Sequence, residues 1–266
     1  MKKTLQHSFK GFDHDSLQFH FYSENFVGAC RLFYTKSLCH SSVWIYVDGK
    51  IKEIFSSSNP IKSKNDNFLD VRVENLSVKE IENKQFQILL DNENLSIHFK
   101  SINLETWNDT RSNVIHLPNM VTEIKYEDNF YQGIGYAKRY SWRPSPTYWG
   151  YRFIQGFNNQ DQSSIWTAEA TFGTKKYDYF KILKPNGQMI NTVNDMSYHR
   201  QNHMEANTTQ GSFKIELEEM DLWEVKLESQ KMNSLLRQRV CKFNAKLRNK
   251  RMSGFAINET CYGTLG

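Results

Sequence analysis

Glu259 is the acidic residue whose sequence surroundings best suit proton transfer. It lies in the strand-like stretch Gly254–Tyr262, GFAINETCY. Because side chains alternate between the two faces of a strand, Glu259 shares its face with three residues: Phe255, Ile257 and Cys261. A carboxyl held among such neighbours stays protonated more readily and can act as a general acid. The structural alternative is a buried acid paired with an arginine, such as Arg139 or Arg152.

Two further residues are catalytic candidates. Glu169 lies in the stretch IWTAEATF, where alternation places it with Thr167 and opposite Trp166. If the pocket is on the tryptophan face, Glu169 points away from it. Tyr140 contributes a phenolic hydroxyl from the aromatic segment that precedes this stretch. Asp161, at a hairpin tip, is expected to be solvated.

The segment 133–172 concentrates aromatic side chains in alternating, strand-like runs. Its large rings are Tyr136, Tyr140, Trp142, Tyr148, Trp149, Tyr151, Phe153 and Trp166. On an all-β scaffold such a surface is typical of a pocket for an apolar molecule. Tyrosine and tryptophan faces also stabilise a carbocation by about 0.5–2 kcal/mol each. We therefore expect five of these residues to bind substrate: Tyr136, Trp142, Trp149, Tyr151 and Trp166. The alternative is that the rings form only a packed core.

Three other side chains are candidates for polar contacts with a substrate. Arg143 opens the rigid stretch RPSP, and Arg152 follows it in the aromatic hairpin. Either arginine could bind a substrate oxygen or carboxylate at the rim of a pocket. His116 lies between the two halves of the chain and could reach a pocket there. A stiff turn and an ordinary loop histidine are the respective alternatives.

The sequence lacks metal and cofactor motifs. His199 and His203 are spaced as i and i+4, but in a polar stretch without an H-E-x-x-H motif. There is no glycine-rich phosphate loop and no GxSxG elbow, and the glycines at 133–135 lead into a strand rather than a helix. We expect no metal and no organic cofactor.

The composition favours β structure and argues against a nucleic-acid partner. Aromatic residues make up 14% of the 266 residues, and the net charge is +5. Acidic and basic residues are nearly equal in number, whereas nucleic-acid binding usually needs a clustered basic stripe. One dense basic cluster occurs: Arg237, Arg239, Lys242, Lys246, Arg248, Lys250 and Arg251. We interpret it as the solvent face of an edge strand pair. The alternative is contact with an anionic ligand or, peripherally, with a membrane surface.

The cysteines and the N-terminus indicate a cytoplasmic protein. Cys30, Cys39, Cys241 and Cys261 form no CxxC pattern, which suits a reducing compartment, with a Cys30–Cys39 bridge as the alternative. The first residues lack the apolar run of a signal peptide, and no stretch approaches about 18 uninterrupted apolar residues. The sequence gives no indication of the oligomeric state.

Strand-like runs separated by turn residues extend over most of the chain. The clearest hairpin signals are Asp48-Gly49 and Pro185-Asn186-Gly187. Residues 103–130 lack a clean period of two, and we interpret them as a crossover with a short helix. Residues 226–239 carry leucines near helical spacing and could be a helix or a strand.

The number of strands predicts the architecture. Each half offers roughly eight short strands, and about eight strands close an up-and-down barrel without exposed edges. The predicted fold class is therefore all-β, with two tandem lipocalin-like antiparallel β-barrels and short helical connections. The expected domains are residues 1–125 and 126–266. A single larger sandwich is the alternative.

Two stretches, 133–172 and 251–266, resemble the carotenoid 1,2-hydratase family and its AttH-like and lipocalin-type Diels–Alderase relatives. The motif GIGY at 133–136 matches the initial strand of the family. The aromatic residues that follow, Trp142, YWGY at 148–151 and Trp166, match its aromatic hairpin, and GFAINE at 254–259 matches its terminal strand. Members often carry an acid after the initial motif, where this chain has AKR at 137–139. The acidic residue of the hydratases is therefore not carried over at that position.

The resemblance implies a pocket at or near the barrel interface that binds a long apolar molecule. We expect a cofactor-independent cyclase, hydratase (a lyase) or isomerase acting on a hydrophobic polyene, terpenoid or polyketide-like molecule of secondary metabolism. The alternative is a non-catalytic lipocalin-like carrier of an apolar ligand. A third alternative is an inert scaffold whose own side chains fill the cavity.

Overall fold

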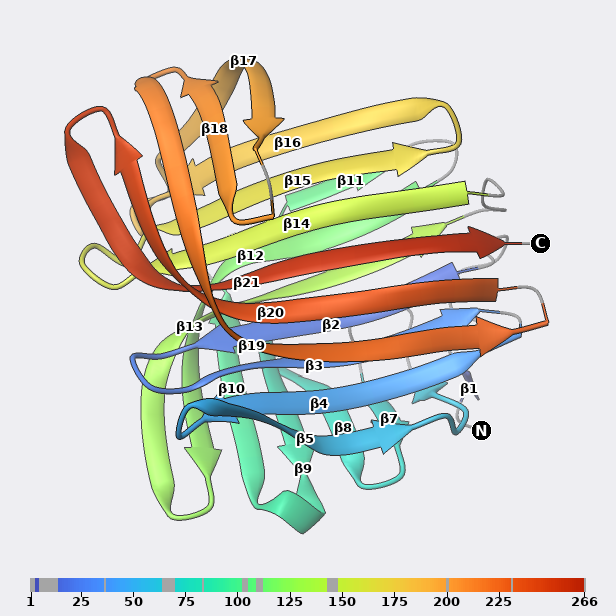
Figure 1. The fold of residues 1–266 in the computed structure, drawn as a ribbon. Helices are drawn as coiled ribbons and strands as arrows, with labels where there is room; N and C mark the ends of the chain where they lie inside the picture. Colours follow the sequence, from blue (N-terminus) through green and yellow to red (C-terminus); the bar gives the residue numbers. More distant parts are fainter. Residues whose placement is uncertain are drawn as a thin grey trace. The chain divides into compact units, whose positions relative to one another are not determined.

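The computed structural model describes residues 3–4, 14–35, 37–63, 70–82, 84–101, 105–108, 112–142, 148–199, 201–230 and 232–265. These residues lie almost entirely in antiparallel strands, which Figure 1 traces along the chain. The prediction of an all-β fold is confirmed. Within these ranges the one helical turn is a 3-10 helix at Asp91–Glu93, and no helix is long and apolar enough to span a membrane.

Contacts divide the chain into two compact units, with the main boundary after Ser145. The N-terminal unit is a curled 13-stranded sheet in the order β1-β6-β7-β8-β9-β10-β12-β13-β2-β3-β4-β5, with β11 paired to β12. Its strands are β1 (Lys3–Thr4), β2 (His14–Tyr22), β3 (Val27–Thr35), β4 (Cys39–Val47), β5 (Lys50–Ser57), β6 (Lys62–Ser63), β7 (Val71–Val73), β8 (Leu76–Glu82), β9 (Gln85–Leu90), β10 (Leu95–Ser101), β11 (Glu105–Asn108), β12 (Ser112–Tyr126) and β13 (Asn129–Trp142).

The C-terminal unit is a closed barrel of eight antiparallel strands in sequence order, in which the last strand pairs with the first. Its strands are β14 (Tyr148–Asn158), β15 (Ser164–Phe172), β16 (Lys175–Leu183), β17 (Met189–Tyr198), β18 (His203–Thr208), β19 (Gly211–Ser229), β20 (Met232–Leu247) and β21 (Lys250–Leu265). Closure pairs every strand on both sides and so removes the exposed edges that invite aggregation.

Three sequence interpretations differ from the observed strands. The expected crossover at 103–130 is formed by β11 and β12, which extend the N-terminal sheet. The ambiguous stretch at 226–239 is strand and belongs to β19 and β20. β13, which the sequence assigned to the second half, pairs with β12 and β2 in the N-terminal unit. The strand itself was expected, and only its unit differs.

Each unit buries one set of alternating side chains in its own core. In β2, Leu17, Phe19 and Phe21 enter the N-terminal core, while the alternating Gln18 and His20 lie on the other face of the sheet. In the barrel, the lumen is filled by apolar residues such as Ile154, Ile165, Phe180, Phe213 and Ala256. The residues that alternate with these point outward.

Two motif glycines lie where backbones approach closely. A Cβ added at Gly133 would lie 1.8 Å from the carbonyl oxygen of Tyr22, and one added at Gly254 would lie 1.9 Å from that of Phe157. Neither position can hold a side chain without moving the neighbouring strand. The glycines of the GIGY and GFAINE motifs therefore mark close approaches between neighbouring paired strands in the two units.

Candidate active site

The outer face of the C-terminal barrel brings together β15, β14, β21 and β20 around Glu259. Because Ile154 and Ala256 point into the lumen, the residues that alternate with them face outward. The register places Glu259 of β21 between Phe153 of β14 and Gln238 of β20. This face carries the acid that the sequence favoured.

Glu259 is buried, and both oxygens of its carboxylate accept hydrogen bonds. The residue is 2% exposed. The Tyr151 hydroxyl donates to Oε1 at 2.5 Å, and Nε2 of Gln238 donates to Oε2 at 2.5 Å. Both of these donors are neutral side chains. Of the two donors, the Tyr151 hydroxyl is the one that can exchange a proton with the carboxylate.

Three of the predicted wall residues share this face. The rings of Trp149 and Tyr151 stack with centroids 6.1 Å apart and an interplanar angle of 19°. Trp166 lies 5.6 Å from Phe153 in a tilted pair, and both tryptophans are buried. Aromatic surface and a hydrogen-bonded carboxyl therefore occur on one side of one sheet.

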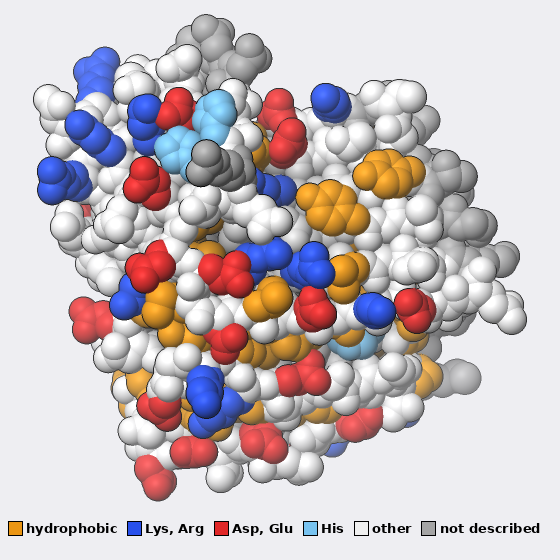
Figure 2. All heavy atoms as spheres, viewed as in Figure 1, with side chains coloured by type: hydrophobic (Ala, Val, Ile, Leu, Met, Phe, Trp, Pro, Cys, Tyr) orange, Lys and Arg blue, Asp and Glu red, His pale blue; other side chains and the backbone are white. Residues whose placement is uncertain are grey.

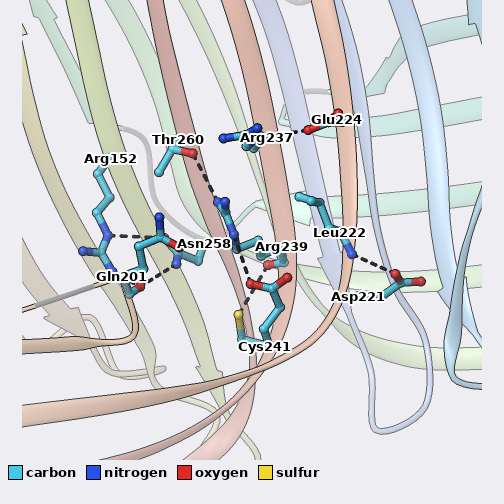
Figure 3. Close-up of polar contacts among 11 residues, drawn as sticks. Arg152, Gln201, Asp221, Leu222, Glu224, Arg237, Arg239, Cys241, Asn258 and Thr260 are labelled. Atoms are coloured by element: carbon cyan, nitrogen blue, oxygen red, sulfur yellow. Dashed lines mark hydrogen bonds and ion pairs between the residues drawn. The ribbon is translucent and has the colours of Figure 1, made fainter.

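Arg152 and Glu169, also predicted for the site, lie on the opposite, lumen-facing side of the sheet. The two residues are direct neighbours in the register of β14 and β15. Arg152 donates from Nε to Oδ1 of Asn258 at 3.4 Å and from Nη2 to the carbonyl of Gln201 (Figure 3). Burial is the main cause that lowers the pKa of Arg152. Arg152 and Tyr151 are consecutive strand residues, so their side chains face opposite sides of the sheet.

Alternation divides the basic cluster on β20 and β21 between the two faces, because Arg237 and Arg239 share the lumen face of Cys241 and Lys242 lies on the other face. Arg239 is 7% exposed and binds Oγ1 of Thr260 at 3.2 Å and Oε2 of Glu219 at 3.1 Å (Figure 3). Arg237 forms an ion pair with Glu224 at 3.0 Å. The two strands are neighbours inside a closed barrel, so the predicted edge pair is wrong. Acidic and basic side chains are interspersed on the face shown in Figure 2.

Tyr136, Tyr140 and His116 belong to the N-terminal unit. Tyr136 and His116 are buried on the sheet face opposite the core, with ring centroids 5.9 Å apart. Tyr140 is half-buried on the same face, with Nζ of Lys138 5.2 Å from its ring centroid. His116 is a strand residue of β12 and not the loop residue that the sequence suggested.

The sequence did not single out His20, the centre of a buried polar group on this face. Nε2 of His20 lies 3.0 Å from the Gln18 amide nitrogen and 3.5 Å from the Tyr136 hydroxyl, and Nδ1 lies 3.3 Å from the Tyr22 hydroxyl. All four residues are at most 9% exposed. The polar alternation of HDSLQFHFY was the available signal, but alternation alone suggests a solvent face.

A buried ion pair lies on the core side of the same unit. Arg139 donates to Asp15 from Nε at 3.2 Å and from Nη2 at 2.7 Å, and the Ser141 hydroxyl donates to Asp15 at 3.0 Å. The side chains of the arginine and the aspartate are 1% and 4% exposed. The bidentate geometry satisfies two charges that would otherwise be costly to bury.

Two predicted residues cannot be placed. Arg143 and the side chain of Trp142 lie outside the described residues.

A recess of about 540 Å³ opens in the C-terminal unit beside His199 and His203, and none of the predicted aromatic wall residues lines it. In the part of the chain that the structure describes, no three side chains are grouped to hold a metal ion.

Solved structures with this fold carry very different sequences. The chain matches an AttH protein of Nitrosomonas europaea with a TM-score of 0.58 and 10% identity, over 94% of this chain and 92% of that one. It matches kievitone hydratase from Nectria haematococca with a TM-score of 0.62 and 12% identity, over 93% and 88%. It matches CghA, solved with Sch210972, with a TM-score of 0.59 and 8% identity, over 96% and 89%.

No protein-family model and no curated protein sequence matches the chain. The likeness to the three structures extends over nearly the whole of each chain. The chain therefore has the lipocalin-like tandem fold that its glycine and aromatic motifs indicated.

Proposed function

We propose that the protein is a cofactor-independent enzyme that cyclises, hydrates or isomerises an apolar substrate by proton transfer. The substrate class is a polyene, terpenoid or polyketide-like molecule. The observation that carries the proposal is the buried Glu259 carboxylate, held by Tyr151 and Gln238 beside stacked aromatic rings. The fold likeness to kievitone hydratase supports it.

The geometry suits a two-residue proton relay. When Glu259 carries a proton, it donates that proton to the Tyr151 oxygen, and the tyrosine O–H is free to protonate an alkene or enol carbon. The cationic centre that forms is stabilised by neighbouring ring faces, by about 0.5–2 kcal/mol each. Loss of a proton back to Tyr151 and Glu259 completes an isomerisation. Capture by water or by an internal double bond, followed by the same proton return, completes a hydration or a cyclisation.

The test is incubation of the purified protein with an extract of apolar metabolites, followed by mass spectrometry. The expected result is the loss of at least one compound and the appearance of a product. Glu259→Gln should slow this turnover by about 10²–10⁴-fold, the usual contribution of an acid–base group. Glu228→Gln, at an exposed position of the same barrel, is the matched control.

Two results would overturn the assignment. Full turnover by both Glu259→Gln and Trp149→Ala would show that the chemistry occurs elsewhere. An apolar ligand that stays bound and chemically unchanged, with no product from any extract, would indicate the carrier instead. Native mass spectrometry of the purified protein separates these outcomes.

A further inference from the structure

Two buried hydrogen-bond donors lie in the strand row next to Tyr151. Trp149 of β14, Gly263 of β21 and Ser234 of β20 are side by side in the register. Trp149 is 7% exposed and Ser234 is 2% exposed. The indole Nε1 and the serine Oγ have no hydrogen-bond partner within the described ranges of the chain. Leaving such a buried group unpaired is energetically costly.

The side chains that carry the two donors meet above Gly263. A Cβ added at Gly263 would lie 2.6 Å from Cβ of Ser234 and 2.9 Å from Cε2 of Trp149, the ring atom bonded to Nε1. The two side chains therefore fill the space above the glycine, which places the two donor-bearing groups next to each other. The indole N–H can only donate, and the serine hydroxyl can donate as well.

We propose that Trp149 and Ser234 bind one uncharged oxygen of the substrate, such as the carbonyl of a ketone, ester or amide. Two adjacent donors without a partner fit an oxygen acceptor. The next row of the face consists of Tyr151, Cys261 and Leu236, none of which supplies a positive charge. A carboxylate buried here would lose its hydration without a cation to compensate.

The position of this oxygen site deepens the proposed function, on which its catalytic meaning rests. Trp149 and Tyr151 are two residues apart on one strand, a separation of about 7 Å. An oxygen bound at Trp149 thus places carbons two to four bonds away near the Tyr151–Glu259 pair. Polarising a carbonyl makes its neighbouring C–H groups more acidic and its conjugated double bond more reactive. The substrate is accordingly an oxygenated apolar compound and not a plain hydrocarbon.

Binding of three matched probes to the full chain tests this inference without requiring turnover. Propiophenone carries a ketone, propylbenzene replaces it with CH₂, and 3-phenylpropanoate carries a carboxylate. The readout is the set of tryptophan indole N–H signals in a ¹⁵N-labelled sample, with the Trp149 signal assigned by Trp149→Phe. We expect the ketone to bind about tenfold more tightly than the hydrocarbon and to shift the Trp149 signal downfield, as a new hydrogen bond requires.

Substitutions distinguish the contribution of the two hydrogen-bond donors to ketone binding from that of aromatic packing. Trp149→Phe and Ser234→Ala should each reduce the ketone preference to about threefold or less, while Trp223→Phe, at a buried tryptophan elsewhere in the barrel, should leave it unchanged. Equal binding of ketone and hydrocarbon, preference for the carboxylate, or an unmoved Trp149 signal at probe saturation in water would overturn the inference. Glu259→Gln should keep the ketone preference. Loss of turnover in that variant therefore tests the proposed function separately.

Discussion

Glu259 has two different hydrogen-bond partners, and the difference decides what each can contribute. Tyr151 carries a proton that can be exchanged, whereas the Gln238 amide only orients the carboxylate. Gln238 therefore orients the Glu259 carboxylate, and proton exchange takes place on the Tyr151 side. Substitutions at the two partners should therefore have unequal effects.

Tyr151→Phe is the sharpest test of the relay. It removes the hydroxyl but keeps the ring that stacks on Trp149, so the barrel should fold normally. We expect kcat to fall by about 10²-fold or more, because the proton path to the substrate is cut. Tyr177→Phe, at a tyrosine that is 49% exposed on the same barrel, is the control. An unchanged kcat in Tyr151→Phe would remove the tyrosine from the mechanism.

The buried Asp15–Arg139 ion pair contributes to stability and has no role in the proposed reaction. Arg139→Met leaves the Asp15 carboxylate buried without its cation, and the expected loss is about 3–5 kcal/mol in the free energy of unfolding. The double variant Asp15→Leu/Arg139→Met should recover most of that loss, because no charge remains buried. Urea unfolding of both variants measures it. Equal stability of the wild type and the single variant would contradict the burial of the pair.

At the scale of strands, the motif glycines set how closely two backbones pack. A methyl group at residue 254 collides with the Phe157 carbonyl, so Gly254→Ala should destabilise the barrel by about 1–3 kcal/mol. Ser253→Ala, one residue earlier in β21, should change stability by less than about 0.5 kcal/mol. Thermal unfolding of both variants makes the comparison. A Gly254→Ala barrel as stable as the wild type would show that the strands can separate at no cost.

The strand pattern could be predicted from sequence because its cause is local. Alternating apolar residues in LQFHFY and IWTAEATF, with turn residues between the strands, indicate β structure directly. The same alternation correctly separated Glu169 from Trp166. It failed for β12, where a bulge between Leu117 and Met120 shifts the register and conceals the period.

The site could be predicted only in part because its partners are distant in sequence. Tyr151 and Glu259 are 108 residues apart and meet only because β14 closes the barrel on β21. Gln238 and Ser234 carry no pattern that marks them before the register of β20 is known. The buried His20 was missed for the same reason, since alternation shows the face of a side chain and not whether that face is covered.

At the scale of the whole molecule, the buried histidines predict that the free energy of unfolding decreases at acidic pH. Burial, assisted by the charge of Arg31, lowers the pKa of His40 to about 4, and the same two causes lower that of His14 to about 3. Unfolded histidine has a pKa of about 6.5, so the unfolded state binds more protons below that pH. The stability that depends on keeping these histidines neutral is therefore fully present above about pH 6.5. It is lost as the pH falls toward their pKa values in the folded state.

The expected loss is about 1.4 kcal/mol per pH unit for each histidine over that window. Urea unfolding between pH 7 and pH 4 measures the slope. His40→Gln should make the slope shallower by the contribution of one group. If the free energy of unfolding had the same slope against pH in the wild type and in His40→Gln, His40 would have the same pKa in the folded and unfolded states.

The fold alone does not specify the reaction. The three similar structures share only 8–12% identity with this chain over nearly its whole length, so the architecture tolerates almost complete replacement of its side chains. A function must be argued from particular side chains, and the proton relay is the claim on which the proposed role of the outer face depends.

Solvent deuterium incorporation tests that claim most directly. Turnover in D₂O by the wild type should give a product one or more mass units heavier, because the transferred proton comes from Glu259 and Tyr151, which exchange with solvent. Glu259→Gln should give almost no product in the same time. An unlabelled product formed equally fast by both proteins would contradict proton transfer at this site.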